Sequence, residues 1–404
     1  MLRRPLAVIV VVLALAPAAA ARPLTGSPLN VTLSAALELP VLSSTRTSAL
    51  VVDLESGQIV FAKNERLALV PASNEKLAVT YAALAALGPG YRFRTQVLGE
   101  GELDEGTWEG NLVLRGFGDP TLSSLGLTRL ATQLRLLGIR RVAGAVVADE
   151  TFFDARRTAP GWKASFAMNE SAPLSALSVD RGRYRHRLTG APAHAAAARF
   201  DELLLKQGIV VAGEPRLGSA DADAFPLAEL LSDPLDGILQ FMDRRSDNFT
   251  AELVLKQLGA VIRGAGTTAA GSEVVYDELR EAGVSLLGAR FADGSGLSRL
   301  DRLSATTLVQ LLRAAWDDLD LRVPMWSALA VAGVNGTLED RLESLPARGH
   351  VHAKTGTTNL ASALSGYVDD RYVFAIVQNG RPVPYWWARQ AQDRFVQALA
   401  ARAF

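Results

Sequence analysis

The sequence predicts a mixed α/β protein in which helices flank one mainly antiparallel sheet and an inserted α+β domain interrupts the chain. Three observations favour this fold class. β-Rich runs lie near both ends, a hairpin over 48–62 and three strands over 350–378, so the two ends are expected to share one sheet. Helical patterns accompany both groups of strands. Between them, the segment 91–226 has short strands, turns and many charges, which indicates a separate domain.

The first helix is expected directly after the hairpin. Apolar residues recur at helical spacing from 71 to 87, and Gly88, Pro89 and Gly90 end the pattern. Ser73 is therefore predicted to lie in the first turn of this helix. The remaining elements are expected, in chain order, as helix 127–137 in the insertion, helical structure over 227–258, strands 350–355, 361–368 and 371–378, and a closing amphipathic helix 386–401.

Composition limits the function. The 404 residues are 49% hydrophobic, and 42 basic residues balance 42 acidic ones, which describes a globular protein with a sizeable core. Nucleic-acid binding is not expected, because such proteins usually carry a clustered basic excess. The chain has no cysteine, so disulfides, thiolate metal sites and cysteine nucleophiles are excluded. Covalent catalysis would have to use another nucleophile, such as serine.

The N-terminus has the pattern of a secretory signal peptide over residues 1–21. Arg3 and Arg4 precede an apolar run over 6–16, and small residues follow it. An uncleaved membrane anchor is the rival, but the run is shorter than the roughly 20 residues that span a bilayer. We therefore expect export to a periplasm or to the outside of the cell, with no stable membrane span after cleavage.

The first candidate motif is S-x-x-K, formed by Ser73 and Lys76. Residues three apart lie on one face of a helix, so the lysine amine can reach the serine hydroxyl. A serine becomes a good nucleophile when a base takes its proton, and lysine can serve if its pKa is depressed. Alone the motif is weak, because a capping serine beside a solvated lysine is the commoner occurrence.

Two further motifs follow. Ser246-Asp247-Asn248 sits at a polar break in a helical region, where the serine can relay a proton and the asparagine amide can bind a peptide. Lys354-Thr355-Gly356-Thr357 ends a predicted strand, where lysine supplies positive charge, the hydroxyls can bind a carboxylate and glycine lets substrate backbone approach. Each motif alone also fits an ordinary polar loop or strand end.

Together and in this order, the three motifs resemble the S-x-x-K, S-D-N and K-T-G set of penicillin-binding proteins and class A β-lactamases. About 170 residues separate Ser73 from Ser246, more than in class A β-lactamases. This layout resembles the low-molecular-mass class C penicillin-binding proteins, the D-Ala-D-Ala carboxypeptidase/endopeptidase family. Further matching segments begin at Gly118, Gly161, Ser175, Asp293 and Asn335.

The resemblance implies a β-lactamase/transpeptidase-like catalytic domain over 22–90 and 227–404 and an inserted domain over 91–226. It implies that a further domain of the family is missing or reduced near 183–191. It also implies a serine-type D-Ala-D-Ala carboxypeptidase, and both terminal trimming and cleavage of D-Ala cross-links remain open. Peptidoglycan stem peptides would be the substrate, and β-lactam antibiotics would be inhibitors. No cofactor and no metal are expected.

The resemblance also implies roles for individual residues. Ser73 would be the acylated nucleophile and Lys76 its base, while Ser246 would relay a proton and Asn248 bind the substrate amide. Lys354 would provide the electrostatic field. The residues expected to bind substrate are Thr355, Gly356 and Thr357 for the terminal carboxylate and oxyanion, and Leu297, Arg299 and Trp162 around the stem-peptide side chain. Relatives carry an acidic residue shortly after the tryptophan, where this chain has Lys163, Ala164 and Ser165.

Three alternatives were weighed. A β-lactamase would share the acylation chemistry but needs a dedicated deacylating base, and no convincing glutamate loop follows Asn248. A catalytically silent wall-binding protein would be expected to lose at least one motif residue, and none is lost. A metal site at His350 and His352 is disfavoured, because no nearby carboxylate in the sequence completes a ligand set.

Overall fold

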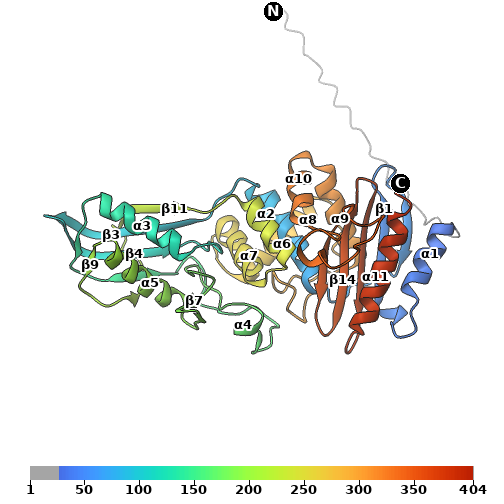
Figure 1. The fold of residues 1–404 in the computed structure, drawn as a ribbon, viewed down its shortest axis with the longest axis horizontal. Helices are drawn as coiled ribbons and strands as arrows, with labels where there is room; N and C mark the ends of the chain where they lie inside the picture. The colour runs from blue at the N-terminus through green and yellow to red at the C-terminus, as the bar shows by residue number, and fades with distance from the viewer. Residues whose placement is uncertain (1–26, 404) are drawn as a thin grey trace, which may run out of the picture.

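The computed structural model describes residues 27–403, so the predicted signal peptide lies outside the described residues. The molecule is elongated (Figure 1). One end holds the sheet built from both ends of the chain, and the other end holds β3, β4, β9, α3 and α5. No helix among the described residues is long and apolar enough to cross a membrane.

The first sheet has the strand order β12-β13-β14-β15-β1-β2, and every neighbouring pair is antiparallel. Early strands thus pair with late ones, with Leu50 opposite Ala375. This confirms the predicted fold class and the shared sheet. The strands are β1 (Thr47–Asp53), β2 (Ile59–Lys63), β12 (Ala330–Val331), β13 (Val351–Thr357), β14 (Ala361–Val368) and β15 (Tyr372–Asn379).

Helices cover both faces of this sheet, and the period-two alternation of its strands explains why. Val373, Ala375 and Val377 join a core with α2 and α6 to α10, whereas Phe374 and Ile376 join a core with α1 and α11. The helices are α1 (Pro28–Leu37), α2 (Glu75–Leu87), α6 (Leu235–Arg245), α7 (Asn248–Arg263), α8 (Thr268–Glu281), α9 (Ala305–Asp317), α10 (Leu319–Ala328) and α11 (Tyr385–Ala400).

The insertion has its own sheet, in the order β10-β6-β4-β3-β11, and off this path β5 pairs with β4 while β9 pairs with β5. It combines antiparallel pairs around β3 with parallel pairs around β6, and α3 and α5 share its core. The elements are β3 (Arg94–Asp104), β4 (Thr107–Gly116), α3 (Ser124–Leu136), β5 (Arg141–Val142), β6 (Val146–Asp149), α4 (Phe166–Asn169), α5 (Pro192–Lys206), β9 (Val210–Val211), β10 (Arg216–Leu217) and β11 (Phe225–Leu231).

One expected helix is wrong at its start. The run 227–231 was expected to be helical, but β11 (Phe225–Leu231) pairs with β3 along the edge of the second sheet. Cross-strand pairing overrides the helical propensity of this leucine-rich run. We therefore propose that the insertion extends from 91 to 231, slightly beyond the expected boundary at 226. Near 183–191 the chain forms only the short hairpin of β7 (Arg183–Tyr184) and β8 (Arg187–Leu188).

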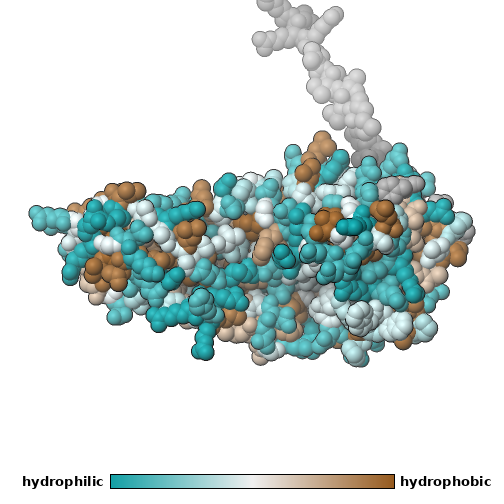
Figure 2. Space-filling view, viewed as in Figure 1, coloured by the Kyte–Doolittle hydropathy of each residue, from teal (hydrophilic) through white to brown (hydrophobic). Residues whose placement is uncertain are grey.

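The surface in this view is a mixture of residue types. Figure 2 shows hydrophobic residues scattered among hydrophilic ones over both ends of the molecule. Isolated apolar residues of this kind are ordinary on globular proteins. The surface in this view therefore does not by itself mark a functional site.

Candidate active site

Ser73 lies in a 3-10 turn, Ala72–Asn74, that leads directly into α2. The turn is held in an unusual conformation, since Ala72 has a φ of 50°, where side chains other than glycine are uncommon. Asn74 fixes the turn to the sheet: its Nδ2 donates to the Lys354 carbonyl at 2.9 Å, and its Oδ1 accepts from Ser365 Oγ at 2.7 Å. The nucleophile candidate thus lies where the turn before α2 meets β13 and β14.

Lys76 joins the first motif to the second. Its side chain is fully buried, and its Nζ donates to Ser73 Oγ at 3.2 Å, to Asn248 Oδ1 at 2.8 Å and to the Ser295 carbonyl at 2.6 Å. Burial lowers the pKa of this lysine from its ordinary value, although nearby carboxylates such as Asp293 oppose the shift. A lysine with a lowered pKa, in contact with a serine hydroxyl, can accept its proton.

Lys354 joins the second motif to the third. It lies on β13, is fully buried and donates from Nζ to Ser246 Oγ at 2.9 Å. Burial, and then the charge of Lys76, lower its pKa to about 7. Ser246 can face the lysine because it ends α6 in the left-handed conformation, with a φ of 55°, immediately before α7 begins at Asn248.

A buried carboxyl of α6, Asp243, interacts electrostatically with both lysines. Its Oδ2 accepts a hydrogen bond from Thr80 Oγ1 at 2.6 Å. Burial raises its pKa to about 6, while the charges of Lys354 and Lys76 act in the opposite direction. The sequence analysis missed Asp243, because an aspartate in a charged helix segment carries no local signal of burial.

Two glycines let backbone approach the nucleophile turn. A Cβ on Gly356 would lie 2.8 Å from the Pro71 carbonyl oxygen and 3.1 Å from the Ser73 nitrogen. A Cβ on Gly296 would collide with the Ala72 carbonyl. Strand β13 and the loop around Gly296 therefore both contact the backbone of this turn, and only glycine permits the approach.

The loop that carries Gly296 is organised by Asp293. Its carboxylate accepts from the backbone nitrogens of Gly296 and Ser298, each at 2.7 Å. Trp162 Nε1 donates to the same carboxylate at 2.7 Å. Trp162 therefore holds the loop, and among the described residues it is not one of those that line the neighbouring cavity.

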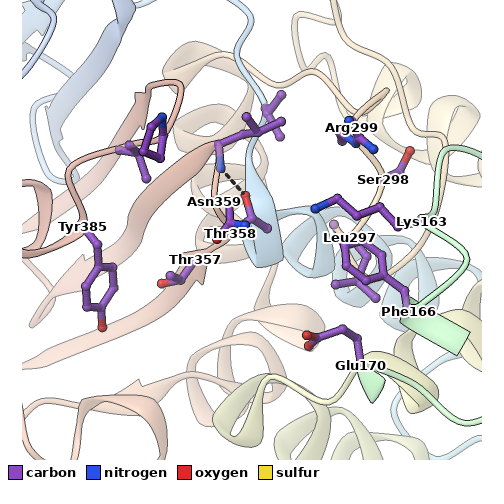
Figure 3. Close-up of a pocket in the computed structure, with 15 residues that line it drawn as sticks. Lys163, Phe166, Glu170, Leu297, Ser298, Arg299, Thr357, Thr358, Asn359 and Tyr385 are labelled. Carbon is purple, nitrogen blue, oxygen red and sulfur yellow. Dashed lines mark hydrogen bonds between the residues drawn. The ribbon is translucent and has the colours of Figure 1, made fainter. Parts of the chain in front are cut away.

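That cavity, of about 410 Å³, lies beside Thr357 (Figure 3). Leu297 and Arg299 both line it, and so do Lys163 and Glu170 of the insertion, whereas Trp162 is not among its lining residues. The residues lining it are Val70, Lys163, Phe166, Glu170, Gly296, Leu297, Ser298, Arg299, Thr357, Thr358, Asn359, Leu360, Pro382, Val383 and Tyr385.

Glu170 also contacts the second motif, since its carbonyl accepts from Asn248 Nδ2 at 2.9 Å. At the other side of the site, Thr355 Oγ1 donates to Thr337 Oγ1 at 2.8 Å, which holds the third motif against a 3-10 turn, Gly336–Leu338. Glu170 and Thr337 were not predicted. Their places depend on how a loop of the insertion and a turn before β13 fold back on the site.

Behind Lys76 lie further buried acids. Glu75, Glu252 and Asp301 are all fully buried. Burial raises the pKa of all three, to about 8 for Glu252, whose Oε1 accepts from the nitrogens of Gly294 and Ser295. Glu75 and Glu252 were not predicted for the same reason as Asp243, whereas Asp301 lies in a loop whose burial depends on long-range packing.

Comparison with known proteins gives consistent results. The sequence profile of the D-Ala-D-Ala carboxypeptidase 3 (S13) family matches residues 29–191 and 187–402. A D-alanyl-D-alanine carboxypeptidase of an Actinomadura species is 32% identical over 460 aligned residues, covering 92% of this chain and 84% of the relative. The D-alanyl-D-alanine carboxypeptidase DacB of Haemophilus influenzae is 24% identical and covers 86% of this chain and 91% of its own.

Solved structures agree on the fold. Penicillin-binding protein 4 of Haemophilus influenzae superposes with a TM-score of 0.82 at 22% identity, over 92% of this chain and 99% of that one. A predatory peptidoglycan endopeptidase of Bdellovibrio bacteriovorus superposes with a TM-score of 0.58 at 18% identity, over 88% and 92% of the two chains.

Proposed function

Because the chain belongs to the D-Ala-D-Ala carboxypeptidase 3 (S13) family, we propose that it cleaves peptidoglycan stem peptides through an acyl-enzyme on Ser73. The activity is that of a serine-type D-Ala-D-Ala carboxypeptidase. Ser73 Oγ attacks the carbonyl carbon of the penultimate D-alanine, and Lys76 accepts the hydroxyl proton. The 3.2 Å contact between Lys76 and Ser73, together with the lowered pKa of the lysine, supports this role.

The leaving D-alanine needs a proton on its amine. Ser246 would deliver it, a role supported by the 2.9 Å contact of its hydroxyl with Lys354 Nζ. Lys354, with Thr355 and Thr357, would bind the terminal carboxylate of the substrate. Water then hydrolyses the ester on Ser73 and restores the enzyme.

The oxyanion that forms during acylation of Ser73, and again during hydrolysis of the ester, requires preorganised hydrogen-bond donors. The backbone N–H groups of Ser73 and Thr357 are our candidates, because β13 runs past the nucleophile turn at Gly356. Asn248 would bind the amide of the substrate, and its bond to the Glu170 carbonyl would orient the amide group.

The cavity beside Thr357 would hold the side chain of the third residue of the stem peptide. Arg299 suits a carboxylate there. This chain lacks an acidic residue directly after Trp162, and Glu170 offers the anionic partner for a substrate amine in its place. Lys163 adds a positive charge to the lining. A diamino acid bearing both groups fits this lining.

β-Lactams are proposed as inhibitors, since relatives of this fold have been solved with a β-lactam or acylated by penicillin G. The structural similarity to a peptidoglycan endopeptidase of Bdellovibrio bacteriovorus supports cleavage of cross-links as a second activity on the same acyl donor. Export, inferred from the N-terminal pattern, would bring the enzyme to its substrate.

One observation carries the proposal: Lys76 bonds Ser73 and Asn248, and Lys354 bonds Ser246, so that hydrogen bonds of the two buried lysines connect all three motifs. The test is product analysis of muropeptides by mass. The protein should remove a terminal D-alanine from pentapeptides, and Ser73→Ala should not. Full activity in Ser73→Ala would overturn the assignment.

A further inference from the structure

A second hollow lies on the outer side of α11, the helix whose first residue, Tyr385, lines the active-site cavity. It measures about 830 Å³ and is lined by Trp386 and Trp387 together with polar side chains. Trp386 is 78% exposed and Trp387 49% exposed. Exposed large aromatics on consecutive positions are unusual for a surface helix and indicate a binding surface.

Polar side chains of the hollow are held in place by hydrogen bonds and burial. Arg341 is buried, yet it lines the hollow and donates from Nε to Asp393 Oδ1 at 3.0 Å. Carboxylates and guanidinium groups therefore stand beside two flat aromatic rings. The lining contains Asp340, Arg341, Trp386, Trp387, Arg389, Gln390, Asp393, Arg394 and Gln397.

Tyr385 links the hollow to the active-site cavity, because it lines the cavity and directly precedes Trp386 in the sequence. This residue lines the cavity on the side opposite Lys163 and Arg299 (Figure 3). Its hydroxyl accepts from Arg389 Nη1 at 2.8 Å, and Arg389 lines the hollow. A substrate that leaves the cavity past Tyr385 would reach the tryptophans next.

We propose that this hollow binds the glycan strand to which the stem peptide is attached, an inference that rests on the proposed function. Two amino acids separate the third stem residue from its sugar, a span of about 7 Å in extended form. An aromatic ring can cover the apolar C–H face of a sugar, while carboxylates, amides and guanidinium groups bond its hydroxyl and N-acetyl groups.

A membrane surface fits the hollow less well. Binding to anionic lipid relies on clustered cations, whereas this hollow contains Asp340 and Asp393 as well as arginines. An interfacial helix also needs a free apolar face, but the apolar face of α11, including Phe395 and Leu399, packs against the sheet.

The test compares kcat/KM for a disaccharide-pentapeptide and for the same pentapeptide without sugar. The wild-type protein should favour the glycosylated substrate by about tenfold, and a double variant, Trp386→Ala with Trp387→Ala, should reduce the ratio to about one. Replacing both by Phe should retain most of the preference. Leu136→Ala, an exposed apolar position on α3 of the insertion, is the matched control.

Penicillin acylation should be equal in all these proteins, which separates this proposal from the proposed function. If no protein is acylated or cleaves either substrate, the proposed function fails. If the wild-type ratio is already one, or the double variant loses both substrates equally, the glycan site is refuted. The proposal would also be overturned if the wild type sediments with phosphatidylglycerol vesicles, the double variant does not, and the ratio of kcat/KM values is the same in both proteins. That result would assign the surface to lipid binding.

Discussion

Replacing Lys354 with methionine should move the pH dependence of acylation upward. The two buried lysines repel each other, and burial together with the charge of Lys76 lowers the pKa of Lys354 to about 7. Because they titrate as a pair, the first proton leaves the doubly charged state at a lower pH than it would leave a single lysine. Acylation needs a neutral Lys76, and in the variant Lys76 alone must lose the proton that either lysine of the wild-type pair can lose, so the midpoint should lie at higher pH.

The size of the shift follows from Coulomb's law. Two unit charges roughly 5–8 Å apart interact by about 2–3 kcal/mol at an effective dielectric constant of about 20, which corresponds to about 1.5–2.5 pKa units. Burial is the first cause of both shifts and remains in the variant. We expect the midpoint to rise by about 1–2 units while staying below the ordinary lysine pKa of about 10.4.

Asp243→Asn provides the opposite perturbation. The carboxyl titrates near 6, so above that pH its charge favours the charged lysines. Its removal should lower the midpoint by about one unit, and asparagine can still accept the Thr80 hydrogen bond. In the double variant, with both Lys354 and Asp243 replaced, the two shifts should largely cancel.

The assay is the second-order rate of acylation by a fluorescent penicillin, measured across pH for the wild type and the three variants. An ascending limb that moves up with Lys354→Met and down with Asp243→Asn is expected. A wild-type profile that is flat through neutrality, or a midpoint that falls when Lys354 is removed, would refute Lys76 as the base.

Two further predictions concern the pocket and stability. Arg299→Ala should raise KM about ten- to hundredfold for a peptide with a diamino acid carboxylate, and much less for a simple diacyl-D-Ala-D-Ala peptide; equal losses would make Arg299 structural. Glu252→Gln should raise Tm at pH 8 relative to wild type and change it little near pH 5. Folding raises the pKa of Glu252 to about 8, so its stabilisation is present below the ordinary value of 4.5 and is lost as pH rises through 8. Glutamine can still accept the bonds from Gly294 and Ser295, and a Tm difference independent of pH would contradict the linkage.

The fold was predictable where the sequence pattern is local. The hairpin over 48–62, the three late strands and the closing helix depend on alternation, helical spacing and turn residues, and the structure has all of them. The strand at 227–231 could not be predicted, because the composition of this run favours a helix and only its pairing with β3 makes it a strand. Such long-range pairing leaves no mark in the segment itself.

The site shows the same division. Ser73 and Lys76 could be paired from their spacing, and their contact at 3.2 Å follows from it. Asp243 and Glu252 could not be identified, because each looks like a solvent-facing helix charge until α6 and α7 pack against α2. Trp162 was expected in the pocket, whereas the fold of its loop presents Lys163 to the cavity instead.

Formation of the acyl-enzyme on Ser73 is tested most directly by mass spectrometry of the protein after reaction with penicillin, followed by peptide mapping of the adduct. We predict one penicilloyl group per chain, on the peptide that contains Ser73, and no adduct in a folded Ser73→Ala variant. An adduct on another residue, or unchanged labelling of Ser73→Ala, would contradict the account.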